Sequence, residues 1–275
     1  MTGADRRVRI GVQLQPQHAT YAELRQACAD AEETGVDVVF TWDHFYPLYG
    51  DADGAHFECW TVLAAWAEAT SRVEIGALVT CNSYRNPNLL ADMARTVDHI
   101  SDGRLILGIG SGWFERDYDE YGFEFGTFPS RLRDLTRAMP VIEERLARLN
   151  PPPVRPMPIL IAGVGEQVTL KLVARHATAW HASFPDRPDD LVSKVAALRR
   201  HCEAIGRDPA DIEWGLGIEP DDIDRFLRED ADRYVDMGFT QFTLGYNGPA
   251  WTVERGRDVL AWRDERNRSR TRGVA

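Results

Sequence analysis

The feature of this sequence that most constrains its fold is a strand–helix–strand pattern within residues 73–113. A short apolar run at 73–79 is typical of a strand buried on both faces. Asn86 and Pro87 predict the start of a helix, because Asn caps free N–H groups and Pro fits the first helical position. A second apolar run follows at 105–109. Such a unit favours two parallel strands joined by a right-handed crossover.

The same alternation of apolar strand and amphipathic helix continues along the chain. Thr20 and Glu23 form a capping-box pattern that opens the first helix. Residues 113–128 are expected to be irregular, a last helix is expected from about 249 to 266, and the basic tail after it is expected to fray. Eight strand–helix alternations predict an α/β fold of the (β/α)8 TIM-barrel type. The expected strands are 8–14, 36–42, 73–79, 105–109, 158–162, 178–184, 212–218 and 239–246.

Composition bounds the kind of protein. The 275 residues fit one large domain, 1–275, and the formal net charge of −11 argues against nucleic acid or an anionic membrane as a partner. The first residues contain no apolar leader, and no apolar run approaches the roughly 18 residues of a membrane span. The four cysteines are scattered without CxxC spacing, so small buried residues are expected. A soluble cytoplasmic protein is the expectation.

Polar residues gather where the expected strands end, which is the edge where barrels bind ligands. Asp43 and His44 follow the second strand, where a histidine could exchange a proton beside a carboxylate. A structural histidine that holds a loop is the equal alternative. The other histidines show no metal-ligand spacing and no GxSxG motif occurs, so neither a metal site nor a serine hydrolase is expected.

Two glycine-rich loops follow strands, at 108–112 and 162–166. Their backbone N–H groups could hold a phosphate, and the second loop is expected to lead straight into a helix N-terminus, which favours an anion. Tight strand–helix turns explain both loops equally well. Aromatic residues concentrate in loops at one end of the expected barrel, which suits a planar cofactor or an apolar substrate. Trp60 is the one most expected to be ordinary core. The aromatic set is Phe45, Tyr46, Tyr49, Phe57, Trp60, Trp113, Phe114, Tyr118 and Tyr121.

Three motifs together resemble the luciferase-like monooxygenase superfamily, specifically its branch that uses the deazaflavin coenzyme F420. They are WDHF at 42–45, GALVTCNSYRNPNLLADMARTVDHISDGRLILGIGSGW at 76–113 and IAGVGEQVTLKLVARHATAW at 161–180. The match runs from the first strand to about Trp180. The resemblance implies a single luciferase-like (β/α)8 barrel, in agreement with the count of strands.

The resemblance also implies roles for individual residues. Asp43 would contact the cofactor, and His44 would accept a proton from a substrate alcohol. A bulge with a non-proline cis peptide would support the central ring around Ala77-Leu78-Val79. The remaining cofactor-binding residues fall into groups: Leu78, Val79, Thr80 and Asn82 at the ring, Gly110, Ser111 and Gly112 at the polar chain, and Gly163, Gly165 and Glu166 near the phosphate.

The sequence departs from the family pattern in several places, one of them the loop Ala162-Gly163-Val164-Gly165, which is richer in glycine in related sequences. Related sequences read A-D-x-W-N where this chain has Ala177-Thr178-Ala179-Trp180-His181, which puts the contacts of the sixth strand in doubt. Leu48 and Trp113 stand where sugar-phosphate dehydrogenases of the branch carry a tryptophan and a glutamate, so a sugar phosphate is not the expected substrate.

The resulting hypothesis is an F420-dependent oxidoreductase that transfers a hydride between C5 of the deazaflavin and a small organic substrate. His44 would exchange the substrate proton, Glu115 is the candidate second acid, and Phe45, Leu48, Trp113 and Phe114 would form an apolar pocket. An FMN-dependent monooxygenase that uses O2 with a separate flavin reductase is the first alternative. A non-catalytic flavin- or deazaflavin-binding barrel is the second. A homodimer is plausible because barrels of this family often pair.

Overall fold

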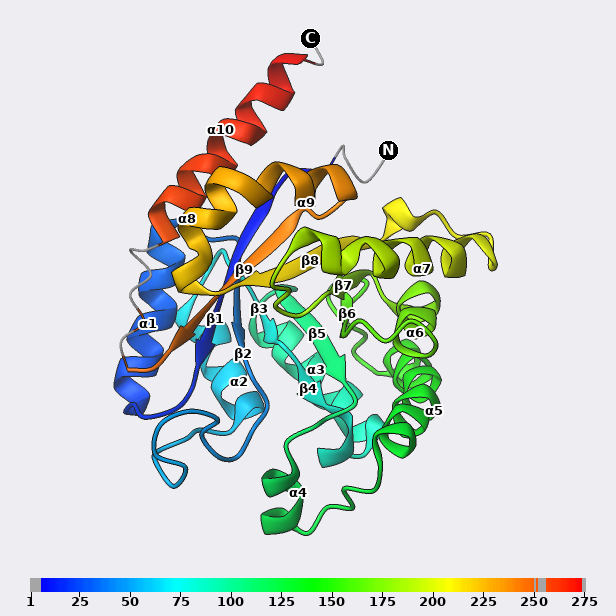
Figure 1. The fold of residues 1–275 in the computed structure, drawn as a ribbon. Coiled ribbons are helices and arrows are strands. Elements are labelled where there is room, and N and C mark those ends of the chain that lie inside the picture. Colours follow the sequence, from blue (N-terminus) through cyan, green and yellow to red (C-terminus); the bar gives the residue numbers. More distant parts are fainter. Residues whose placement is uncertain (1–5, 250, 252–255, 274–275) are drawn as a thin grey trace.

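A ring of parallel strands forms the centre of the molecule in the computed structural model, which describes residues 6–249, 251 and 256–273 (Figure 1). Hydrogen bonding joins the strands in the order β3-β2-β1-β9-β8-β7-β6-β5-β4, and a further β3–β5 pairing closes the ring. The α/β barrel predicted from the sequence is therefore confirmed. The strands are β1 (Arg9–Gln15), β2 (Val38–Thr41), β3 (Glu74–Ala77), β4 (Thr80–Cys81), β5 (Leu105–Gly110), β6 (Ile159–Ala162), β7 (Ala179–His181), β8 (Glu213–Ile218) and β9 (Gln241–Asn247).

The third predicted strand is divided into β3 and β4 by Leu78 and Val79, which a cis peptide bond joins. Both pieces pair with β5: Ile75 lies opposite Leu105, and Thr80 lies opposite Ile109. The two pieces therefore occupy one position in the ring, so eight positions are filled by nine strand segments.

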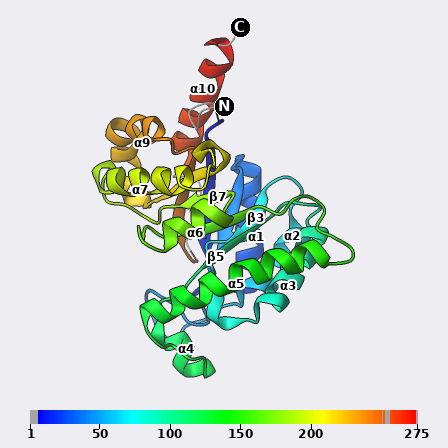
Figure 2. The ribbon, with the colours of Figure 1, turned by 90° about the vertical axis from the view of Figure 1, so that its right-hand side faces the viewer.

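Helices follow the strands on the outside of the ring, as Figure 2 shows for α5, α6 and α7. The capping box of Thr20 and Glu23 is present, and Asn86 accepts a hydrogen bond from the N–H of Asn88 ahead of Pro87. The helices are α1 (Tyr21–Thr34), α2 (Cys59–Ala69), α3 (Pro87–Ile100), α4 (Glu115–Tyr121), α5 (Phe128–Arg148), α6 (Thr169–His176), α7 (Val192–Glu203), α8 (Ile223–Arg225), α9 (Ala231–Met237) and α10 (Arg257–Gly273).

Two sequence predictions about helices are wrong. The segment 113–128 is not wholly irregular, because it contains α4, which ends at Gly122 in the left-handed conformation. The basic tail does not fray after 266, because α10 continues to Gly273. Residues 250 and 252–255 of the predicted last helix lie outside the described residues, and the described helix begins at Arg257.

The inside of the barrel is packed by side chains that lie over glycines. Gln241 fills the space above Gly215, where an added Cβ would lie 2.3 Å from its Oε1. Phe184 covers Gly217, where an added Cβ would lie 2.3 Å from the ring. The larger core lies between strands and helices and includes Trp60, Cys28, Cys59 and Cys202. Cys81 belongs to a smaller aromatic cluster. All four cysteines are buried, as the sequence predicts.

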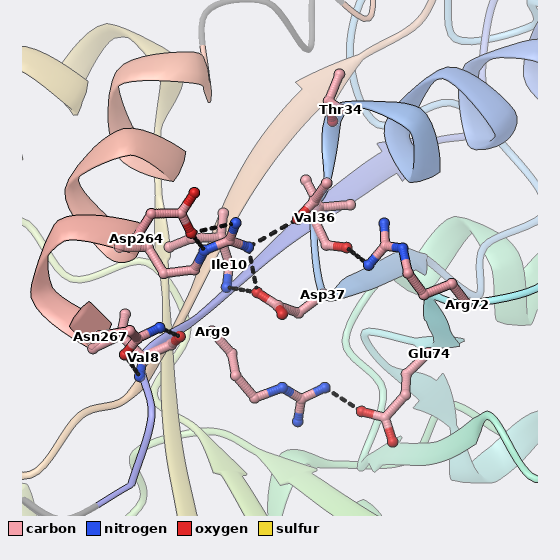
Figure 3. Close-up of polar contacts among 12 residues, drawn as sticks. Val8, Arg9, Ile10, Thr34, Val36, Asp37, Arg72, Glu74, Asp264 and Asn267 are labelled. Carbon is pink, nitrogen blue, oxygen red and sulfur yellow. Dashed lines mark hydrogen bonds and ion pairs between the residues drawn. The ribbon is translucent and has the colours of Figure 1, made fainter. Parts of the chain in front are cut away.

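Polar contacts join the chain segments at the amino ends of the strands (Figure 3). Arg9 forms ion pairs with Glu74 and, at 3.0 Å, with Glu213. Asn267 of α10 binds both the N–H and the carbonyl of Val8 at 2.9 Å. In barrels of this kind, contacts at the amino ends of the strands contribute to the stability of the fold. In Figure 1, α10 extends from this end and α4 lies at the opposite one. None of the helices in the described part of the chain is long and apolar enough to cross a membrane.

Candidate active site

A cavity of about 370 Å³ lies at the carboxyl ends of the strands, where barrels bind their ligands. Its wall mixes aromatic rings, glycines and uncharged polar groups, and its charged members are two carboxylates, Asp43 and Glu219. The lining residues are Gln13, Gln15, Trp42, Asp43, His44, Leu48, Tyr49, Leu78, Val79, Thr80, Cys81, Tyr84, Gly110, Ser111, Gly112, Trp113, Phe128, Ala162, Gly163, His181, Ser183, Phe184 and Glu219.

His44 stands in this wall with one ring nitrogen bound to a buried carboxylate. Its Nδ1 lies 2.7 Å from Oδ2 of Asp117, whose side chain is fully buried. A carboxylate only accepts, so the contact places the proton on Nδ1 and leaves the lone pair of Nε2 free in the neutral ring. His44 is 9% exposed. A histidine held in this way is suited to take up and release a proton at Nε2.

Asp117 is held in place by three further hydrogen bonds. Its Oδ1 accepts the backbone N–H groups of Phe45 and Tyr46 at 3.1 and 3.2 Å, and its Oδ2 accepts the hydroxyl of Tyr84 at 3.0 Å. Asp117 is not among the site residues predicted from the sequence, because residues 113–128 are expected there to be irregular. The usable signal was a charged run that ends at Gly122, which marks a short helix with acidic residues in its first turn.

Aromatic rings enclose His44. The rings of Trp42, Trp113 and Phe114 lie with their centroids 5.6, 5.7 and 5.5 Å from it, in edge-on arrangements. Nε1 of Trp42 donates to Nε2 of His56 at 2.9 Å, and burial lowers the pKa of His56 to about 4. His56 is therefore neutral near pH 7 and serves to orient Trp42.

Asp43 lines the cavity, and both oxygens of its carboxylate are bound by other groups. Arg85 donates to both of its oxygens, at 2.5 and 2.9 Å, and the N–H of Cys81 donates to Oδ2 at 2.9 Å. Burial raises the pKa of Asp43, and the guanidinium of Arg85 opposes this effect. Arg85 also pairs with Glu58 at 2.7 Å. The group links the end of β2 to the start of β4; its predicted contact with a cofactor stays a prediction.

The bulge between β3 and β4 forms one wall of the cavity. The carbonyl of Leu78, at the cis bond to Val79, accepts Nε2 of Gln13 at 2.7 Å. Glycines on β5 let the bulge approach. An added Cβ at Gly108 would lie 1.9 Å from the carbonyl of Ala77, and one at Gly110 would lie 2.7 Å from Cγ2 of Val79.

Most of the residues that the sequence assigned to a site do line this cavity. They are Asp43, His44, Leu48, Leu78, Val79, Thr80, Gly110, Ser111, Gly112, Trp113 and Gly163. Their geometry places them together, and their roles toward a ligand stay predictions.

Several predicted site residues do not line the cavity. Phe45 stacks on Tyr121, with their ring centroids 3.9 Å apart. Phe114 packs edge-on against the ring of His44. Glu115 is exposed on the first turn of α4, and the inward position belongs to Asp117. Asn82 lies buried in the short turn after β4.

The second glycine loop differs from its prediction. A turn at 166–168 separates it from α6, so the loop does not lead straight into a helix. Glu166 pairs with Lys194 at 2.8 Å, and Gly165 and Glu166 do not line the cavity. Gly163 does, and its carbonyl accepts Nε1 of Trp180 at 2.9 Å.

Thr178, just before β7, and His181, at its end, differ from the family pattern and lie toward opposite ends of the barrel. The hydroxyl of Thr178 accepts the N–H of Ile159 at 2.9 Å, near the amino ends of the strands. His181 lines the cavity. The missing carboxylate at 178 therefore leaves the cavity wall intact. Within the described ranges no three His, Cys, Asp or Glu side chains gather as a metal site would require.

The sequence and the fold of this chain are similar to those of known proteins. The family model described as luciferase-like monooxygenase matches residues 7–220. The F420-dependent glucose-6-phosphate dehydrogenase of Amycolatopsis mediterranei is 29% identical over 231 residues, which cover 77% of this chain and 68% of that protein. Two solved structures share the fold. They are an F420-dependent secondary alcohol dehydrogenase bound to an F420–acetone adduct (TM-score 0.79, 18% identity) and the monooxygenase RslO1 of Streptomyces bottropensis (TM-score 0.69, 15% identity), each covering 92% of this chain and 98% of its own.

Proposed function

The chain belongs to the luciferase-like monooxygenase family, and from this premise we propose that it is an oxidoreductase that uses coenzyme F420 to transfer a hydride to or from a small organic substrate. The relative from Amycolatopsis mediterranei, which is named for its dependence on F420, supports the choice of cofactor. The observation that carries the proposal is His44, which lines the cavity while Asp117 binds its far nitrogen at 2.7 Å.

The cavity fits a flat ring with polar edges. The glycines and Ser111 at 110–112 leave room along one wall, and the bulge at Leu78 and Val79 borders it. Three buried polar atoms of the wall have no partner within the described residues: Oε1 of Gln15, Oγ1 of Thr80 and Nε2 of His181. A deazaflavin carries carbonyl and N–H groups on its edge, which such atoms would bind. Gly163 would lie near the phosphate of the coenzyme.

The reaction divides between coenzyme and protein. When bound, the deazaflavin supplies a carbon that accepts or donates a hydride. His44 takes the proton of a substrate alcohol at Nε2 when the substrate is oxidised, and returns it to a carbonyl in the reverse direction. Asp117 stabilises the ring while it is charged. Leu48 and Trp113 exclude water from one side of the substrate.

The substrate is proposed to be neutral and small. No Lys or Arg is among the described residues that line the cavity, and the carboxylate of Glu219 adds negative charge there. A phosphorylated substrate would lack a cation to bind its phosphate. This agrees with the absence of the sugar-phosphate residues at positions 48 and 113.

The test is titration of the purified protein with F420 and, separately, with FMN. The proposal expects micromolar binding of F420 and much weaker binding of FMN. His44→Ala should abolish turnover and leave F420 binding nearly intact. Equal loss of binding would refute the proton-transfer role of His44.

The family name and the shared fold of RslO1 keep the FMN-dependent monooxygenase as a second candidate. It requires O2 and a separate flavin reductase. Preference for FMN and oxygen uptake during turnover would favour it. Tight binding of either coenzyme without turnover across a broad substrate panel would favour a non-catalytic binding protein.

A further inference from the structure

His181 is a buried histidine of the cavity wall, and its Nε2 is one of the three polar atoms there that have no partner among the described residues. It ends β7, pairs with Ala162 of β6 and Gly215 of β8, and is 1% exposed. Its backbone carbonyl accepts the N–H of Gly163 at 3.0 Å. The main chain around the ring is therefore fixed by both neighbouring strands and by the loop after β6.

One ring nitrogen of His181 is committed to the backbone. The N–H of Ser183 donates to Nδ1 at 3.2 Å. A backbone N–H can only donate, so Nδ1 carries a lone pair. Burial lowers the pKa of His181 to about 3, which keeps the ring neutral near pH 7. A neutral ring with a bare Nδ1 carries its hydrogen on Nε2, so Nε2 is a fixed hydrogen-bond donor.

This donor has no acceptor within the described part of the chain. A buried donor without a partner is unfavourable relative to a satisfied one, because it has lost its hydrogen bond to water. The cost is recovered when a ligand supplies the acceptor. Phe184 lies beside the histidine ring, with centroids 6.1 Å apart, and covers the neighbouring strand β8 at Gly217. The donor therefore lies beside a flat apolar surface, which suits the edge of a planar ring.

We propose that Nε2–H of His181 is a coenzyme-binding donor of the cavity and binds a hydrogen-bond acceptor, a carbonyl oxygen or an unprotonated nitrogen, on the edge of the coenzyme ring. The inference rests on the proposed function in that the ring is a deazaflavin. It holds equally for a flavin, whose edge carries the same carbonyl groups. Gln15 of β1 and Thr80 of β4 offer further polar contacts from other walls of the cavity.

The test compares three variants by F420 titration, with quenching of coenzyme fluorescence as the signal. His181→Met keeps the bulk and removes the donor, so the dissociation constant should rise about 10–100-fold. His181→Gln places an amide N–H near the position of Nε2 and should recover most of the affinity. His176→Met, in which a histidine of α6 paired with Glu143 is removed, is the control and should bind as the wild type does.

A second measurement separates ligand binding from a structural role. Without coenzyme, His181→Met and His181→Gln should melt at similar temperatures, because both lose the Nδ1 acceptor of the Ser183 N–H and the Nε2 donor had no partner among the described residues. A clear fall in melting temperature together with unchanged binding would overturn the inference. Wild-type binding of F420 with equal binding by His181→Met would overturn it and leave the proposed function standing. Absence of F420 and FMN binding by the wild type would overturn both.

Discussion

Nδ1 of His44 and Oδ2 of Asp117 lie 2.7 Å apart although 73 positions separate them in the chain. His44 follows β2 and Asp117 lies on α4, so the pair joins the loop after β2 to α4 at the carboxyl end of the barrel. The contact determines which nitrogen of His44 faces the cavity as an acceptor. The two residues therefore form one hydrogen-bonded unit.

Asp117→Asn should separate catalysis from binding. The side-chain oxygen of Asn can still accept from Phe45 and Tyr46, but its NH2 group cannot accept from Nδ1–H of His44. The ring is then expected to carry its hydrogen on Nε2, so turnover should fall about 10²–10⁴-fold while F420 affinity stays nearly unchanged. Asp119→Asn, an exposed change on the same helix, should have wild-type turnover. Full activity in Asp117→Asn would contradict the assignment.

Arg85→Met should destabilise the protein strongly. The side chain of Asp43 is fully buried, and loss of its cation leaves an unpaired charge, at a cost of about 3–5 kcal/mol. The free energy of unfolding, measured in urea, tests this. Adding Asp43→Asn should restore part of the loss, because an amide needs no counterion. A single-variant loss below about 1 kcal/mol, as is usual for surface pairs, would show that Arg85 is dispensable.

Two glycines of β5 should respond differently to Ala. At Gly108 the added Cβ would lie 1.9 Å from a backbone carbonyl, so Gly108→Ala should not yield folded protein. At Gly110 the obstacle is the side chain of Val79, at 2.7 Å, which can move. Gly110→Ala should fold with a loss of about 1–3 kcal/mol and bind F420 more weakly. Thermal melting and coenzyme titration measure both effects; equal behaviour of the two variants would contradict the close approach of bulge and strand.

The free energy of unfolding should decrease as the pH is lowered below about 6.5. Burial lowers the pKa of His181 to about 3 and that of His56 to about 4. Both titrate near their ordinary value when unfolded, so the unfolded chain binds more protons between those values and pH 6.5, and acid favours it. Each group contributes a slope of up to about 1.4 kcal/mol per pH unit. His181→Met should flatten the slope of unfolding free energy between pH 6.5 and 4; an unchanged slope would show that His181 is not buried as a neutral ring.

The barrel was predictable because its signals are local. Each strand is a short apolar run, and helix starts such as Thr20 and Asn86 carry their own capping residues. Several residues of the cavity could be placed for a similar reason, since the carboxyl ends of parallel strands meet at one edge. His44 and Gly110 follow from that rule together with the family motifs.

The rest depends on contacts between distant segments. Whether Phe45 or Leu48 faces the cavity is decided by packing against Tyr121 and its neighbours, which no local pattern encodes. Glu115 and Asp117 are both acids on the first turn of α4, and only the direction of the helix selects the second as the partner of His44. The unpartnered nitrogen of His181 follows from one backbone bond to Ser183, which the sequence does not reveal.

The bonds from the backbone of Phe45 and Tyr46 to Asp117 make the state of α4 observable. These two amide hydrogens are protected from exchange with solvent deuterium only while α4 is docked against the loop after β2. Their exchange rate therefore reports the fraction of molecules in which His44 has its carboxylate partner. The docking of α4 against the loop that carries His44 can therefore be followed through two amide hydrogens of that loop, before any substrate is known.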